Sequence, residues 1–188
     1  MVPNRFTVVL DTNVLYGALH RNVILSLAAG GLLRPRWSQR TLSELSLRLA
    51  DRIGEEQSEK QVARIQEAFP EGSILVSTSV ESSLELPDAD DKHVLAAAIQ
   101  AKAAQIATDN VKDFPPANVA PHDIEVVTAD HLIAHTVALA PTRAVASIRR
   151  MRKRLNKPSF DAEQLLLKLE SHGLPEAASE LSEYADLL

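Results

Sequence analysis

Four acidic positions spread along the chain have residue types and spacing that suit metal-assisted chemistry. The first three are Asp11, Glu44 and Asp91, and the fourth lies in a segment that contains both Asp109 and Asp113. A carboxylate that faces the interior of a fold is costly unless it meets a metal ion, a basic partner or water. Oxygen ligands without His or Cys select Mg²⁺ or Mn²⁺ rather than zinc. Ions held in this way activate water and neutralise phosphate charge, so the pattern predicts hydrolysis of phosphodiester bonds.

Each of the first three positions also has a purely structural interpretation. Asp11 follows a predicted strand, where Asp is a good helix N-cap. Glu44 completes a capping box that begins at Thr41, although it also lies beside an apolar stripe of its helix. Asp88 is the natural N-cap of the next helix, and Asp91 in the first turn suits the helix dipole. Only the joint occurrence of these acids favours the metal site.

The spacing leaves the fourth acidic position open. Asp109, Asn110 and Asp113 all offer oxygen atoms after the same predicted strand. Hydroxyl groups nearby suit contacts to a metal-bound water or to a phosphate. The accessory candidates around the four acids are Thr12, Asn13, Asp88, Thr108 and Asn110.

Alternating strands and helices are expected to position these residues. Apolar, β-branched runs predict strands at residues 7–10, 33–37, 74–77, 105–108 and 124–128. Helical spacing predicts intervening helices at residues 14–29, 38–53, 58–69 and 88–102. This alternation indicates a three-layer α/β/α sandwich with a central parallel sheet. Sites in such sheets form at the carboxyl ends of strands, which is where Asp11 and Asp109 fall.

The rest of the chain predicts helices only. A basic helix at residues 142–155 is followed by a break at Pro158 and by short amphipathic helices at 160–171 and 175–187. We therefore expect a nuclease-like domain over residues 1–130 and a helical C-terminal extension over residues 131–188.

Composition excludes several classes of protein. The 188 residues contain no cysteine, which excludes disulfides and thiolate metal sites. No apolar run approaches the roughly 20 residues of a membrane span, so a soluble cytoplasmic protein is expected. The net charge is −5, yet residues 131–160 hold 7 Lys or Arg and no acid. Such a segment grips RNA backbone, forms a solvated helix face, or folds back to meet its own domain or a protein partner.

Four motifs in order carry a family resemblance. They are Val9-Leu-Asp-Thr-Asn-Val-Leu15, Thr41-Leu-Ser-Glu-Leu45, Pro87-Asp-Ala-Asp-Asp-Lys-His-Val-Leu-Ala-Ala-Ala98 and Ala107-Thr-Asp-Asn-Val-Lys-Asp-Phe-Pro115. Their order and spacing across residues 6–128 resemble the PIN domain family of metal-dependent ribonucleases, whose small bacterial members are commonly VapC toxins. The tail from Pro141 looks like the C-terminal extension of a toxin-like subgroup.

The resemblance implies a ligand set and partners. Metal ligation is implied for Asp11, Glu44 and Asp91, with a fourth acid in the Thr108 segment, where Asn110 occupies the place of the Asp that many relatives carry. The implied cofactor is Mg²⁺, with Mn²⁺ as a substitute. The implied partners are an RNA substrate, a VapB-like antitoxin protein and a second copy of the chain in a homodimer, with no membrane.

Three other functions compete with a toxin ribonuclease. A housekeeping nuclease for RNA processing would use the same acids. A phosphatase of the haloacid-dehalogenase type would use Asp11 as nucleophile, but that chemistry wants Asp at the position of Asn13. A non-catalytic module that binds RNA or protein would use the acids only as helix caps.

Overall fold

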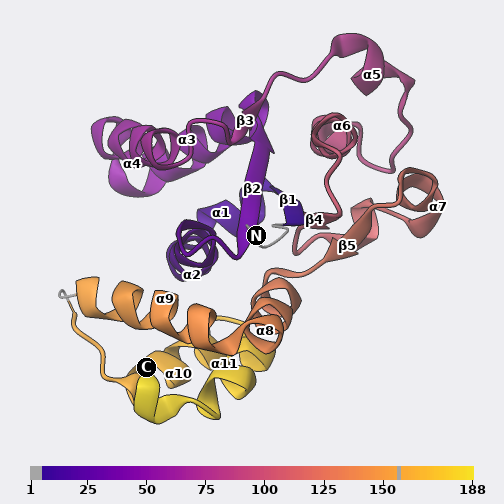
Figure 1. Ribbon diagram of the computed structural model, residues 1–188. Helices are drawn as coiled ribbons and strands as arrows, with labels where there is room; N and C mark the ends of the chain where they lie inside the picture. Colours follow the sequence, from indigo (N-terminus) through magenta and orange to yellow (C-terminus); the bar gives the residue numbers. More distant parts are fainter. Residues whose placement is uncertain (1–5, 156–157) are drawn as a thin grey trace. The chain divides into compact units, whose positions relative to one another are not determined.

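The computed structural model describes residues 6–155 and 158–188, which divide into two compact units (Figure 1). The first unit contains the described residues up to Gly17 and residues 34–127, and the second contains residues 18–33 and the described residues from 128 onward. Helix α2 (Ala18–Ala29) thus groups with the C-terminal helices. The predicted boundary between residues 1–130 and 131–188 stays a prediction.

The first unit contains all five strands and most of the short helices. Its elements are β1 (Phe6–Leu10), α1 (Thr12–Tyr16), β2 (Leu33–Ser38), α3 (Gln39–Ile53), α4 (Glu55–Ala68), β3 (Ser73–Ile74), α5 (Thr78–Ser83), the 3₁₀ turn η1 (Ala89–Asp91), α6 (Lys92–Ala101), β4 (Gln105–Ala107), the 3₁₀ turn η2 (Val111–Asp113), α7 (Pro116–Val119), the 3₁₀ turn η3 (Ala120–His122) and β5 (Glu125–Val127).

The strands form one sheet in the order β3-β2-β1-β4-β5. The pairs β1–β4, β2–β3 and β4–β5 are parallel, as crossover helices require. The predicted fold class is confirmed: the chain has a PIN-like α/β/α fold with a central parallel sheet, followed by C-terminal helices.

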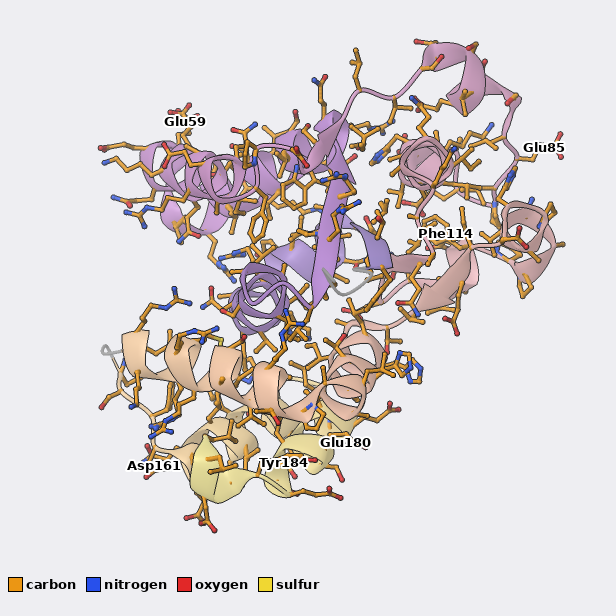
Figure 2. The ribbon with its side chains drawn as sticks, in the orientation of Figure 1. Glu59, Glu85, Phe114, Asp161, Glu180 and Tyr184 are labelled. Atoms are coloured by element: carbon orange, nitrogen blue, oxygen red, sulfur yellow. The ribbon has the colours of Figure 1, made fainter. Side chains whose placement is uncertain are left out.

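Helix α6 packs against the centre of this sheet because its residues are small. Ala96, Ala97 and Ala98 are fully buried, so the helix backbone lies close to the strands. Val9 of β1 belongs to the same buried cluster, as does Phe114, which is labelled in Figure 2. This packing fixes the start of α6, where Asp91 lies, relative to the ends of β1 and β4.

The predicted helix at residues 14–29 is interrupted at Gly17. The backbone there has φ −64° and ψ 114°, which is extended rather than helical. Helix α1 therefore ends at Tyr16, and a second helix begins at Ala18. Glycine is the residue that most readily leaves a helical conformation, so the continuous helix was a wrong prediction for a local reason.

The described residues of the second unit are mainly helical. Its elements are α2 (Ala18–Ala29), α8 (Ala129–Leu139), α9 (Pro141–Arg154), α10 (Ala162–Ser171), α11 (Pro175–Ser182) and the 3₁₀ turn η4 (Ala185–Leu187). Asp130 of α8 caps α11 by accepting hydrogen bonds from the backbone N–H groups of Glu176 and Ala177, at 3.0 and 2.8 Å. Acidic side chains such as Asp161 and Glu180 project outward from its C-terminal helices (Figure 2).

Membrane insertion through a helix finds no support in this fold. Within residues 6–155 and 158–188, every helix falls short of the length and apolar character that a bilayer span needs.

Gly72 gives a close approach that fixes the end of β2. The Trp37 amide N–H donates to the Gly72 carbonyl at 2.9 Å, and the Trp37 side chain is fully buried, edge-on to Phe69. A Cβ atom at position 72 would lie 2.4 Å from the Trp37 ring. Because β2 ends at Ser38, this contact also fixes the residue that begins α3.

We predict that Gly72→Ala destabilises the protein by about 1–3 kcal/mol, since a buried indole ring has little room to shift. Urea unfolding with unchanged m-value measures the effect. The neighbouring Glu71→Ala is the control and should change stability by less than about 0.5 kcal/mol, because that side chain is exposed. Equal stability of Gly72→Ala and wild type would contradict the close approach.

Candidate active site

Asp11 lies where β1 ends, beside the end of β4. Leu10 pairs with Ala107 in the parallel register, and the Asp11 N–H continues the ladder by donating to the Ala107 carbonyl at 3.0 Å. Oδ2 of Asp11 accepts hydrogen bonds from Thr108 Oγ1 at 2.8 Å and from Asn13 Nδ2 at 2.7 Å. The register of two strands therefore holds this carboxylate in one orientation.

Burial of Asp11 raises the pKa of its carboxyl group. Desolvation is the largest cause, since only 5% of the residue is exposed, and the charge of Glu44 raises the pKa further. Hydrogen bonds from Thr108 and from the Thr12 amide oppose this shift. Asp11 caps α1 through the Thr12 amide, so the capping interpretation holds, but the cap uses only Oδ1.

The accessory candidates after β4 form a hydrogen-bonded loop beside Asp11. Thr108 Oγ1 accepts from Asn13 Nδ2 at 3.0 Å and from the Asn110 amide at 3.1 Å. Asn13 Oδ1 accepts from the Asp109 amide at 3.1 Å. These contacts tie the start of α1 to the Thr108 segment.

Glu44 does not belong to a capping box, which corrects that interpretation. Helix α3 begins after Ser38, whose Oγ accepts from the Thr41 amide at 3.0 Å, so Glu44 lies in the second turn. Its carboxylate instead accepts from Thr12 Oγ1 at 2.7 Å and from Arg40 Nε at 3.0 Å. The Thr12 contact joins Glu44 to the residue that follows Asp11.

His93 connects Glu44 to the start of α3. The residue is 2% exposed, with Nδ1 at 2.7 Å from Ser38 Oγ and Nε2 at 3.4 Å from Glu44 Oε1. Ser38 Oγ also lies 3.0 Å from Thr41 Oγ1, so its hydroxyl contacts both side chains. Because a carboxylate only accepts, the contact between Nε2 and Glu44 is a hydrogen bond when the ring hydrogen is on Nε2.

Glu44 is held in its ionised form. Burial, the largest influence, raises its pKa, but the hydrogen bonds from His93 and Thr12 and the charge of Arg40 outweigh it. Together they lower the pKa to about 2. The carboxylate therefore stays negative throughout the physiological range.

Asp91 makes no capping hydrogen bond through its side chain. Asp88 caps η1 by accepting from the Asp90 amide at 2.9 Å, whereas Asp91 occupies the N-cap position of α6 without a side-chain cap. Its pKa is raised to about 6, first by burial and then by the charges of Asp11, Asp88 and Asp113. Acids from three separate segments thus lie close enough to repel Asp91.

Among the acids after β4, Asp113 raises the pKa of Asp91 by its charge. The η2 turn, closed by the Asp113 amide donating to the Asn110 carbonyl at 3.0 Å, returns this residue toward α6. Asp109 is exposed, and its amide is bonded to Asn13. This difference supports Asp113 as the fourth acid.

Arg40, Ser38 and His93 join the site although the motif alone did not assign them. Arg40 also reaches Asp90 at 2.8 Å and Glu81 at 3.9 Å, so it bridges acids from three elements. The i, i+4 spacing of Arg40 and Glu44 could have predicted their ion pair from the sequence. His93 follows Asp91 by two residues, but no spacing rule connects it with Ser38.

The donor chemistry of the site fits a divalent cation. Among the described residues, no three Asp, Glu or His side chains converge closely enough to hold an ion as they stand. The charges of Asp11 and Asp113 nevertheless disfavour ionisation of Asp91, and carboxylate oxygens are the hard ligands that Mg²⁺ prefers. A bound cation would replace this repulsion by attraction.

Asp11, Glu44, Asp91 and Asp109 fall within a family match, which ends one residue before Asp113. The sequence model of the PIN domain matches residues 7–112, which is more than half of the chain, and the model of the VapC50 C-terminal domain matches residues 129–183. The chain therefore belongs to the PIN domain family. Its C-terminal helices further mark it as similar to VapC-type toxins, which confirms the resemblance. Neither the curated proteins nor the solved structures contain a match to it.

We predict that Asp11→Asn lowers the pKa of Asp91 in the metal-free protein. The wild-type group should titrate near 6, and removing the charge of Asp11 should bring this value toward the ordinary 3.8 without reaching it, because burial remains. Carboxyl carbon NMR titration measures both values. Asp51→Asn, at an exposed position of α3, is the matched control.

The same shift has a defined effect on stability. A carboxyl group with a raised folded-state pKa stabilises the fold fully below pH 3.8 and loses that contribution as the pH rises through about 6. The dependence of unfolding free energy on pH in this window should therefore be weaker in Asp11→Asn. An unchanged Asp91 pKa in that variant would show that the two acids are not neighbours.

We predict that His93→Leu raises the pKa of Glu44 from about 2 toward its ordinary 4.5, because a hydrogen bond that favours the charged form is lost. His93→Gln, which retains an N–H donor, should recover part of the shift. NMR titration of Glu44 reports it, and thermal unfolding checks that each variant is folded. His122→Leu, at an exposed position, is the control. An unchanged Glu44 pKa in His93→Leu would contradict the hydrogen bond between these two side chains.

Proposed function

We propose that this protein is a Mg²⁺-dependent endoribonuclease that serves as the toxin of a type II toxin–antitoxin system. The observation that carries the proposal is the raised pKa of Asp91 next to Asp11 and Asp113, inside a PIN domain. Repelling carboxylates of this kind are expected where a cation binds. The VapC50 C-terminal domain match supports the toxin assignment.

The metal ligands in this proposal are Asp11, Glu44, Asp91 and Asp113, with Asp109 as the competing fourth acid. Bound there, Mg²⁺, or Mn²⁺ in its place, would supply activation of a water molecule and neutralisation of phosphate charge. Asp91 would bind the metal in its ionised form, so binding should weaken as the pH falls below its pKa of about 6.

The protein's own residues orient and ionise this site. Thr108 and Asn13 fix Oδ2 of Asp11, and Thr12 fixes Oε2 of Glu44. Such partners determine the direction of a carboxylate before any ligand arrives, which lowers the cost of binding. Arg40 holds the other oxygen of Glu44 at 3.0 Å and keeps that acid charged.

The partners follow from the proposed class. RNA is the substrate, and a small VapB-like antitoxin inhibits the enzyme by presenting a basic side chain to the acids. A homodimer and a cytoplasmic location are expected for this class. A neighbouring small reading frame that encodes the antitoxin would separate this function from housekeeping RNA processing.

Cleavage of RNA tests the proposal. In the presence of Mg²⁺, Asp11→Asn and Asp91→Asn should each reduce the rate of cleavage of a structured RNA by more than the roughly 10–100-fold that outer-shell partners contribute. Asp113→Asn should match these losses, whereas Asp109→Asn should stay close to wild type. Asp51→Asn is the neutral control, and EDTA should abolish cleavage by the wild type.

Other outcomes identify the competing functions. Full activity in both Asp11→Asn and Asp91→Asn would exclude this metal site. A phosphoenzyme trapped on Asp11 would indicate a phosphatase. Absence of Mn²⁺ binding in calorimetry, together with absence of cleavage, would indicate a non-catalytic binding module.

A further inference from the structure

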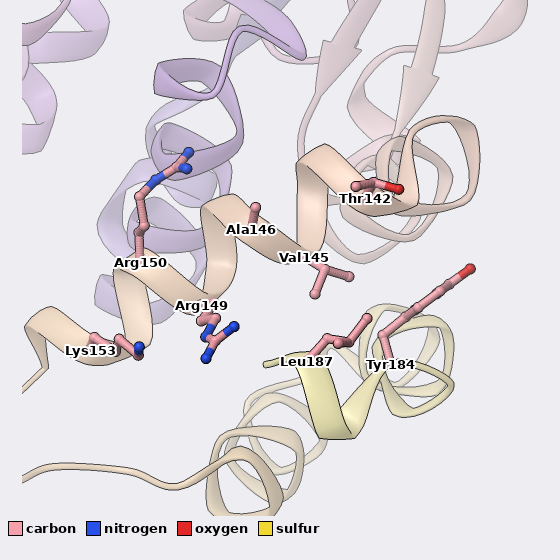
Figure 3. A pocket seen from close by; sticks show the side chains of 8 residues that line it. All are labelled: Thr142, Val145, Ala146, Arg149, Arg150, Lys153, Tyr184 and Leu187. Atoms are coloured by element: carbon pink, nitrogen blue, oxygen red, sulfur yellow. The ribbon is translucent and has the colours of Figure 1, made fainter.

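The second unit contains a cavity of about 590 Å³ between α9 and the C-terminal turn (Figure 3). One wall is formed by α9 and the other by Tyr184 and Leu187. The lining residues are Thr142, Val145, Ala146, Arg149, Arg150, Lys153, Tyr184 and Leu187. The cavity therefore combines three cationic side chains with an aromatic ring and aliphatic groups.

Four of the six basic residues of α9 form two groups that differ in what they contact. Arg143 donates to the carbonyls of Gly30 and Gly31 at 2.9 and 3.2 Å, and Arg152 donates to the carbonyls of Phe160 and Leu188 at 2.6 and 3.0 Å. These two arginines hold the unit together. Backbone carbonyl groups therefore already accept hydrogen bonds from both guanidinium groups.

Arg149 and Lys153 form the other group. Both are exposed, and neither has a hydrogen bond or ion pair with any residue in the described ranges 6–155 and 158–188. Their i, i+4 spacing places them on the same face of α9. Figure 3 shows Arg149 projecting toward the side of Leu187. The cavity thus has cations that no described acid neutralises.

The opposite wall consists of an aromatic and an aliphatic side chain. Tyr184 is half-buried, and Leu187 is 57% exposed, which is unusual for so large an apolar side chain. Val145 of α9 points toward Leu187 (Figure 3). An aromatic ring beside exposed aliphatic groups suits a planar, uncharged ligand surface.

A second cavity lies along the same helix. It measures about 300 Å³ and is lined by Ser26, Ala29, Ser147, Arg150 and Arg154. Arg150 lines both cavities and extends from α9 on the side away from Leu187 (Figure 3). Its Nη2 donates to Ser147 Oγ at 3.1 Å, which fixes its direction. Cationic positions therefore continue past the first cavity.

We propose that the cavity binds one nucleotide of a single-stranded RNA segment, with the base against Tyr184 and Leu187 and the adjoining phosphates on Arg149 and Lys153. Arg150 would carry the backbone onward to the second cavity. Aromatic stacking next to a basic groove is the combination used for sequence-tolerant single-strand binding. This inference rests on the proposed function, because it assumes that RNA is the substrate.

An acidic peptide fits the two walls less well. Glu183 and Asp186 are exposed and flank Tyr184 and Leu187 in the sequence, so acids lie in the C-terminal turn that forms one wall, whereas the cations of the cavity lie on α9. A nucleotide presents its anionic phosphate on one side and its uncharged base on the other, which matches this asymmetry. A peptide with repeated carboxylates would meet repulsion from the acidic wall.

Fluorescence anisotropy with a labelled single-stranded RNA tests the inference. The full chain is used as Asp11→Asn in EDTA, so that binding is measured without cleavage. Charge reversal at Arg149 and Lys153 together should weaken binding and reduce the slope of log affinity against log salt by about 0.7 for each lost phosphate contact. The matched control is Arg64→Glu with Lys168→Glu, which makes the same change in net charge at exposed positions elsewhere.

Tyr184 is tested with a second probe. Tyr184→Ala should weaken binding of the RNA by between about 5-fold and 150-fold, whereas Tyr184→Phe should keep most of the affinity because the ring remains. Neither change should alter binding of an abasic oligonucleotide of the same length. A purely structural role of Tyr184 would weaken both probes equally, and thermal unfolding checks each variant.

Three results would overturn the inference. The first is that charge reversal at Arg149 and Lys153 leaves the same RNA affinity as the matched control variant. The second is poly-glutamate competing as well as RNA at equal charge, which indicates an acidic protein partner. The third is that Tyr184→Ala weakens binding of the abasic oligonucleotide as much as binding of the normal RNA. Failure of the proposed nuclease is distinguished separately, because it appears as absent cleavage by the wild type.

Discussion

The parallel pairing of β1 with β4 is the constraint on which the candidate site depends. It sets Leu10 beside Ala107, and the next residue on each strand is then a site residue, Asp11 or Thr108. Their side chains bond at 2.8 Å because the strands end at the same level. A shift of one residue would turn Asp11 to the other face of the sheet and separate the pair. The ladder of backbone hydrogen bonds thus determines where the carboxylate points.

The acids near this sheet edge are held by opposing electrostatic effects. Glu44 has a pKa of about 2 because His93, Thr12 and Arg40 favour its charged form despite burial. Asp91 has a pKa of about 6 because burial and three neighbouring acids disfavour its charged form. The protein itself therefore stabilises the charged form of Glu44, whereas the charged form of Asp91 is disfavoured by its acidic neighbours. Such an imbalance is typical of functional sites rather than of structural ion pairs.

The sequence predicted the sheet and the strand-end acids, because both depend on local patterns. An apolar run that ends in Asp predicts a buried strand with its acid at the edge, and the structure contains this arrangement at Asp11. Partners that come from other segments could not be read in the same way. Glu44 matched a capping box, yet the helix begins at Ser38, three residues earlier than that box requires. The choice between Asp109 and Asp113 depends on the η2 turn, and ligation by either acid stays a prediction.

The basic helix shows why charge counted along a sequence differs from charge available at a surface. Seven Lys or Arg within residues 131–160 left three interpretations open: RNA contact, a solvated helix face, or a contact with the same chain or a protein partner. In the folded unit, Arg143 and Arg152 bind backbone carbonyls, so part of this charge stabilises helix packing. Arg149 and Lys153 have no such role among the described residues, and they line a cavity whose opposite wall is aromatic and aliphatic. A solvated helix face alone would leave the arrangement of Tyr184 and the exposed Leu187 opposite these cations without an explanation, whereas a nucleotide uses both walls.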